Sequence, residues 1–125
     1  MLLAADLFLD FLHIFVVLFN LFGWAHRRTR VAHRWLVGMT AFFWLVIGPF
    51  LGALGYCPLT DWHWRIKEAR GIENLPHSYI DYLFRLWGIE TNPVIVDICV
   101  GVTFVIVVSV TSWIWLKERR LRPLH

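Results

Sequence analysis

The sequence predicts an all-α integral membrane protein: a bundle of three transmembrane helices, with two short interfacial helices between the second and third. Hydrophobic residues make up 58% of the chain and the mean hydropathy is +0.60, well above the balance of a soluble domain. Three apolar stretches, residues 3–24, 31–56 and 93–116, exceed the roughly 20 residues that cross a bilayer. The intervening residues 57–92 are too charged to cross. Without repeats or a linker, residues 1–125 are expected to form a single membrane domain.

The first span is apolar but carries a stripe of ionisable side chains. Asp6, Asp10 and His13 fall within about 60° of one another at 100° per residue. A charge near the bilayer centre costs about 2.5–3.5 kcal/mol on insertion scales, so such groups usually face protein or water. The stretch lacks the basic start and small-residue cleavage site of a signal peptide. We therefore expect a mature helix whose polar stripe faces the protein interior.

The second span contains regularly spaced glycines. Gly48, Gly52 and Gly55 recur at i, i+4 and i+7, which predicts a flat strip against which another helix packs closely. Pro49 lacks an amide hydrogen, so it should bend this helix.

The third span begins with a helix start signal. Asn92 is suited to the N-cap and Pro93 to the first helical position. Its many β-branched residues are compatible with a helix, because lipid forces the backbone to pair internally. Asp97 lies about one turn inside this span, and Val107 is expected to face lipid.

The polar segment between the second and third spans predicts two short helices. Thr60 is expected to cap a helix over residues 61–70 that ends at Gly71. Ser78 is expected to cap the next helix, which ends at Gly88. The second of these is amphipathic, so it should lie in the membrane surface or cover the mouth of the bundle.

The distribution of basic residues predicts the orientation. The first loop and the C-terminal tail together hold eight Lys and Arg and one acid, whereas the segment 57–92 holds four basic residues and five acids. The positive-inside rule then places the N-terminus outside and the C-terminus in the cytoplasm. The basic groups border apolar stretches and match no nucleic-acid-binding module, so the expected partner is the lipid bilayer and not nucleic acid.

A set of acidic, histidine and cysteine side chains lies toward the outer end of the predicted bundle. The candidate cofactor-binding residues are Asp6, Asp10, His13 and Asp97, and the candidate metal ligands are Asp6, Asp10, His13, Cys57 and His63. Carboxylates and imidazole could bind a divalent cation such as Zn²⁺, Cu²⁺ or Mn²⁺. Without a metal, a shared proton would suit a proton relay or hydrogen bonds to a quinone. The opposing interpretation is that these side chains only cap helices or form hydrogen bonds within the protein.

The histidines and cysteines also bear on haem binding and disulfide formation. A haem held by two histidines of one chain is not expected, because His13 and His33 differ in depth by about 13 Å, although a symmetric dimer could pair two copies of His13. Cys57 and Cys99 both fall in the outer half, where a disulfide is permitted but not required.

The run CPLTDWHWRIKEARG at 57–71, followed by HSYIDYLF at 77–84, resembles the signature of a family of small bacterial inner-membrane proteins, the domain of unknown function 2784. The pattern of that family reads approximately C-P-L-T-x-x-E-x-x-x-R-x-x-x-G. This sequence departs from it at His63, which replaces the glutamate, and at Lys67, which replaces the arginine. The resemblance implies a location in the bacterial inner membrane and groups Asp6, His13 and Cys57, but it implies no activity.

Two functional hypotheses follow. The first is an accessory or scaffold subunit of a larger membrane complex, or a homo-oligomer, that performs no chemistry. The second is a protein that binds a metal, haem or quinone through the outer Asp/His/Cys cluster. The sequence contains no nucleophile–base set, metalloprotease motif or phosphate-binding glycine loop, which favours a non-enzymatic role without excluding catalysis.

Overall fold

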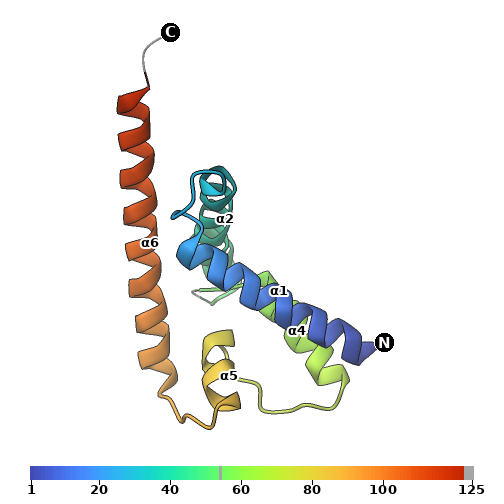
Figure 1. Ribbon diagram of the computed structural model, residues 1–125. Coiled ribbons are helices and arrows are strands. Elements are labelled where there is room, and N and C mark those ends of the chain that lie inside the picture. The colour runs from blue at the N-terminus through green and yellow to red at the C-terminus, as the bar shows by residue number, and fades with distance from the viewer. Residues whose placement is uncertain (54, 123–125) are drawn as a thin grey trace.

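The computed structural model describes residues 1–53 and 55–122, and the regular structure in these ranges is helical (Figure 1). Three helical segments in them are long and apolar enough to cross a membrane: Leu2–Phe22 (α1), Arg30–Phe50, and Pro93–Leu121 (α6). The predicted fold class, an all-α membrane protein with three candidate spans, is confirmed.

The second span is not a regular α-helix. It consists of α2 (Arg30–Phe42), a π-helical segment η1 (Phe43–Ile47) and the short α3 (Gly48–Phe50). The amide of Gly48 bonds the carbonyl of Phe43, five residues back. Proline and π-turns are the usual causes of helix distortion. The irregularity expected at Pro49 is therefore a π-helical segment of five residues that ends two residues before it.

The predicted glycine strip is wrong, because the span ends at Phe50 and not at residue 56. Gly52 and Gly55 follow the helix with φ of +76° and +75°, a backbone conformation that glycine adopts without steric cost. Gly48 is required for a different reason. A Cβ atom there would collide with the carbonyl oxygen of Ala53, because the chain folds back over this position.

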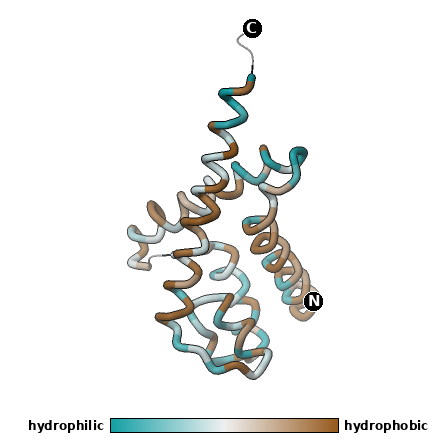
Figure 2. Tube along the Cα trace, turned by 60° about the vertical axis from the view of Figure 1, so that its left-hand side comes forward, coloured by the Kyte–Doolittle hydropathy of each residue, from teal (hydrophilic) through white to brown (hydrophobic). Residues whose placement is uncertain are grey.

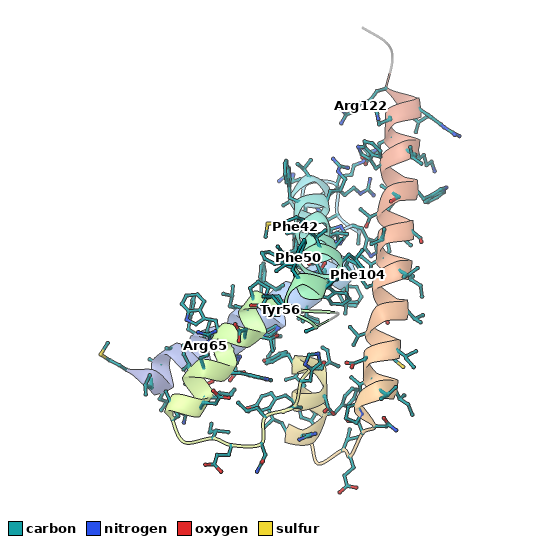
Figure 3. All side chains as sticks on the ribbon, turned by 180° about the vertical axis from the view of Figure 1, so that it is seen from behind. Phe42, Phe50, Tyr56, Arg65, Phe104 and Arg122 are labelled. Carbon is teal, nitrogen blue, oxygen red and sulfur yellow. The ribbon has the colours of Figure 1, made fainter. Side chains whose placement is uncertain are left out.

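Helix α6 stands apart from the rest of the chain along much of its length (Figure 1). Only Val96 and Val107 are buried among its 29 residues. Val107 was expected to face lipid, but it is only 6% exposed and packs inward. The Phe104 ring lies 4.7 Å from the Trp44 ring of η1, and Figure 3 shows Phe104 directed from α6 toward the second span. As predicted, the Asn92 side chain caps α6 by accepting from the Val94 amide.

The two short helices are α4 (Pro58–Ala69) and α5 (Tyr79–Leu86). Helix α4 starts three residues earlier than predicted, because Pro58 occupies its first position and Cys57 its N-cap. Ser78 does occupy the N-cap of α5, although its side chain caps no amide. Both helices end near the predicted glycines, Gly71 and Gly88, which have positive φ.

The two short helices pack against different spans. Helix α4 lies along α1, and α5, the amphipathic helix expected in the membrane surface or over the mouth of the bundle, lies beside the start of α6 (Figure 1). Asp81 of α5 is buried, accepts a hydrogen bond from the Thr91 hydroxyl just before α6, and lies 3.3 Å from Arg85. Figure 2 shows hydrophilic residues at the C-terminal end of α6 and in the loop between α1 and α2.

Candidate functional site

Helices α1 and α4 face each other with matched polar stripes. On α1 the stripe is Asp6, Asp10 and His13; on α4 it is Thr60, His63, Lys67 and Arg70. Residues spaced by three or four lie on one helical face, so each stripe is continuous. The helices run antiparallel, because Asp6 meets the end of α4 and His13 meets its start.

Asp6 is the centre of this polar cluster and is 1% exposed. Its Oδ1 accepts from the Lys67 ammonium at 2.7 Å and lies 2.8 Å from Nε2 of His63. Its Oδ2 pairs with the Arg70 guanidinium. A buried carboxylate is stable only when it is paired and hydrogen-bonded in this way.

Asp10, one turn further along α1, connects the cluster to α5. Its Oδ1 accepts from the Tyr79 hydroxyl at 3.0 Å. Its carboxylate oxygens also lie 3.6 Å from Nε2 of His63 and 3.6 Å from the ammonium of Lys67. The cluster therefore joins α1, α4 and α5.

His13 lies at the end of the cluster that is next to the start of α4. Its ring stacks on the Tyr79 ring, with centroids 3.7 Å apart and planes 8° from parallel. Its Nε2 lies 3.3 Å from the Thr60 hydroxyl. The Nδ1 atoms of His13 and His63 are buried and make no hydrogen bond within the described residues.

The charges of the cluster balance. Asp6 and Asp10 are matched by Lys67 and Arg70 without counting the histidines. Burial opposes the charged form of Lys67, but its hydrogen bond to Asp6 and the negative charge of Asp10 outweigh that effect and raise its pKa. Burial and the charge of Asp10 also raise the pKa of Tyr79, so its hydroxyl remains a donor.

Three of the candidate metal ligands lie close together. One ligand atom each from Asp6, Asp10 and His63 lies within 4.8 Å of the others. A dication between them would meet the ammonium of Lys67, which already contacts Asp6. As it stands, the cluster is a self-compensated ion-pair network, and a metal would require Lys67 to withdraw.

Two predicted members lie outside the cluster. Asp97 is exposed on α6 and makes no hydrogen bond or ion pair with the described part of the chain. Cys57 is the N-cap of α4 with a free thiol, nearly two turns before His63, and Cys99 is free and exposed. The stacked Tyr79 covers His13, which is only 4% exposed, so a haem from a second copy could not approach it without displacing that ring.

Sequence reasoning missed the basic and aromatic partners, namely Lys67, Arg70 and Tyr79. The signal for the first two was present, because both continue the face of α4 that carries Thr60 and His63. Tyr79 gave no such signal, since it reaches the cluster from a separate helix.

A second, smaller polar contact joins α6 to α2 at the end of the spans that lies away from the α1–α4 cluster. Glu118 of α6 lies 2.5 Å from the guanidinium of Arg30 and 3.4 Å from that of Arg34, both on α2. Within α1 and α2, Nε2 of His33 lies 2.8 Å from the carbonyl oxygen of Asn20. The basic first loop and the basic tail therefore lie at the same end of the protein.

Comparison with known proteins agrees with the family resemblance. No curated protein and no solved structure matches the chain. The family model described as Protein of Unknown function (DUF2784) matches residues 2–117, which include the three candidate spans almost entirely and the whole polar cluster. The chain therefore belongs to the DUF2784 family.

Proposed function

We propose that this chain is an accessory subunit that docks through α6 into a larger membrane complex or a homo-oligomer. The supporting observation is the exposure of α6, in which two of 29 residues are buried. In lipid, helices associate by close packing and not by the hydrophobic effect. A helix that packs so little on its own chain has most of its surface available for a partner.

Asp97 indicates which part of α6 would meet that partner. If Trp115 marks the inner boundary, the roughly 20 residues that cross the hydrocarbon core reach back to about residue 95. Asp97 then lies just inside the outer boundary, on an exposed face. Acidic side chains at such positions usually face protein or water, so a donor from a partner helix would satisfy this carboxylate.

Photo-crosslinking in native membranes tests the docking proposal. A photoreactive residue replaces Val105, which is 63% exposed on α6, and in a control it replaces Phe11, which is 74% exposed on α1. The expected result is a discrete protein adduct from position 105 alone, lost when Asp97→Leu is added. If neither position gives a protein adduct and the mildly extracted chain migrates alone, the proposal is wrong.

We also propose that the protein lies in the bacterial inner membrane with its N-terminus outside. The proximity of Glu118 to Arg30 and Arg34 supports placing the basic loop and tail on one side. In a Cys57→Ser/Cys99→Ser background, a cysteine at Glu73 should react with an impermeant thiol reagent added to intact cells. A cysteine at Arg28 should not, and its labelling from outside would reverse the orientation.

A second candidate function, supported by the closeness of Asp6, Asp10 and His63, is binding of a divalent metal. Metal analysis of protein purified without chelators tests it. Stoichiometric Zn²⁺ or Mn²⁺ that is lost in His63→Ala would support it. Absence of metal from both the wild type and Lys67→Met, in which the competing ammonium is removed, would exclude it.

A further inference from the structure

We propose that a groove between α2 and α6 binds one anionic glycerophospholipid, with an acyl chain in the groove and the phosphate at Arg34 and Arg119. The groove has a volume of about 590 Å³ and is lined by one face of α2, from Val31 to Phe42, and by Trp115 of α6. This site is separate from the polar cluster of α1 and α4 and does not depend on the proposed accessory role.

The length of the groove suits a lipid chain. From Arg34, where the phosphate would lie, to Phe42 a helix rises about 12 Å, which is most of one leaflet of a hydrocarbon core of about 30 Å. Apart from Arg34, which lies one turn from Val31, the lining is apolar and aromatic. Gly38 leaves the wall open, because a Cβ atom there would meet nothing within 4 Å.

The charge at the end of the groove suits a phosphate. Glu118 is shared by two arginines, and Arg30 holds it at 2.5 Å while Arg34 lies 3.4 Å away. One carboxylate facing two guanidinium groups leaves an excess positive charge on the side of Arg34. The guanidinium of Arg119 lies over the Trp115 ring, 4.8 Å from its centroid, and adds a second cation at the edge of the groove.

These features favour a lipid over a second copy of the chain. An amphipathic molecule with an anionic head and an apolar tail complements a groove that is basic at one end and apolar along its length. A second copy seated there in parallel would bring its own Arg34 and Arg119 against the first pair. Trp35 and Trp115 both line this end of the groove, and because tryptophan is enriched at membrane interfaces they support placing this end there.

Native mass spectrometry of the delipidated full chain, titrated with phosphatidylglycerol or phosphatidylcholine, tests the site. We expect one phosphatidylglycerol to bind more tightly than phosphatidylcholine. Arg34→Gln should weaken phosphatidylglycerol binding about fivefold, the factor expected from one basic side chain at an anionic surface. Gly38→Leu should block the groove and remove the binding of both lipids.

The matched control is Arg27→Gln, which removes a charge from the exposed loop at the same end of the protein. It should leave the affinity unchanged. Equal weakening by Arg27→Gln and Arg34→Gln would show a diffuse basic surface and overturn the proposal. Unchanged lipid binding by a Gly38→Leu variant with wild-type thermal stability would also overturn the proposal. So would a dimer that excludes lipid and is lost in Gly38→Leu.

Discussion

The protein holds charged groups together at both ends of its spans, and the two ends differ in burial. In the α1–α4 cluster, the side chains of Asp6, His63 and Lys67 are at most 3% exposed, those of Asp10 and Arg70 at its edge are 27% and 29% exposed, and opposite charges are equal in number. At the other end, the side chains of Arg30, Arg34 and Glu118 are 22–29% exposed, and the cations outnumber the acid. The same pairing chemistry thus joins helices at one end and leaves charge available for a ligand at the other.

The physical reason is desolvation. Breaking a buried pair leaves an uncompensated charge without water, whereas an exposed pair exchanges its partner for solvent at little cost. We therefore expect substitutions in the cluster to change the free energy of unfolding, and substitutions at Glu118 to change mainly the local charge.

The largest effect is expected for Asp6→Asn. It leaves Lys67 and Arg70 without their shared carboxylate and should destabilise the protein by about 3–5 kcal/mol. Unfolding in detergent micelles, followed by circular dichroism, measures this effect. Asp97→Asn is the control on an exposed acid, and equal stability of the two variants would show that the cluster does not hold α4 on α1.

A smaller loss is expected for Tyr79→Phe. The change removes the hydroxyl that donates to Asp10 but retains the ring stacked on His13, and a hydrogen bond to a charged group contributes about 1.5–3 kcal/mol. Tyr56→Phe is the matched control, because its hydroxyl contacts the half-buried Asp61. If the control costs as much as Tyr79→Phe, burial is not what strengthens the cluster.

The coupling between Asp6 and Lys67 can be measured with a double-mutant cycle. Asp6→Asn combined with Lys67→Met should cost less than the sum of the single changes, by about 0.5–3 kcal/mol, because the double variant contains neither charge of the pair. Additive losses would mean that the two side chains stabilise the protein independently.

Alkaline pH should weaken the cluster. The pKa of Lys67 is raised above its ordinary value of 10.5, so its contribution is complete below that pH and is lost as pH rises through the folded-state pKa. The raised pKa of Tyr79 acts in the same direction. Unfolding measured from pH 8 to 11.5 should show stability falling at the alkaline end, less steeply in Lys67→Met, and a rise there would contradict this assignment.

The smallest effect is expected for Glu118→Gln at the opposite end. The partly exposed arginines can turn to water, so the unfolding midpoint should not change measurably. Phosphatidylglycerol binding should increase slightly, because the competing carboxylate is gone. A large loss of stability would show that this contact is as important to the fold as the buried cluster.

The fold class and the start of α6 were predictable because they depend on local properties. Length and hydropathy identified three spans, and Asn92 with Pro93 located the start of α6. The extent of the second span was not predictable in this way. Its glycine spacing predicts a helical strip, but the chain folds back over Gly48, and Gly52 and Gly55 have positive φ outside the helix.

For the candidate site, the stripe on α1 could be predicted, because Asp6, Asp10 and His13 share a face of any helix at those positions. The packing of α4 along this stripe, which supplies Lys67 and Arg70 and leaves Asp97 outside, depends on contacts between helices. Helical periodicity relates residues within one element. Which element supplies the opposite charge depends on how desolvated side chains find partners across helices, and a linear pattern does not contain that information.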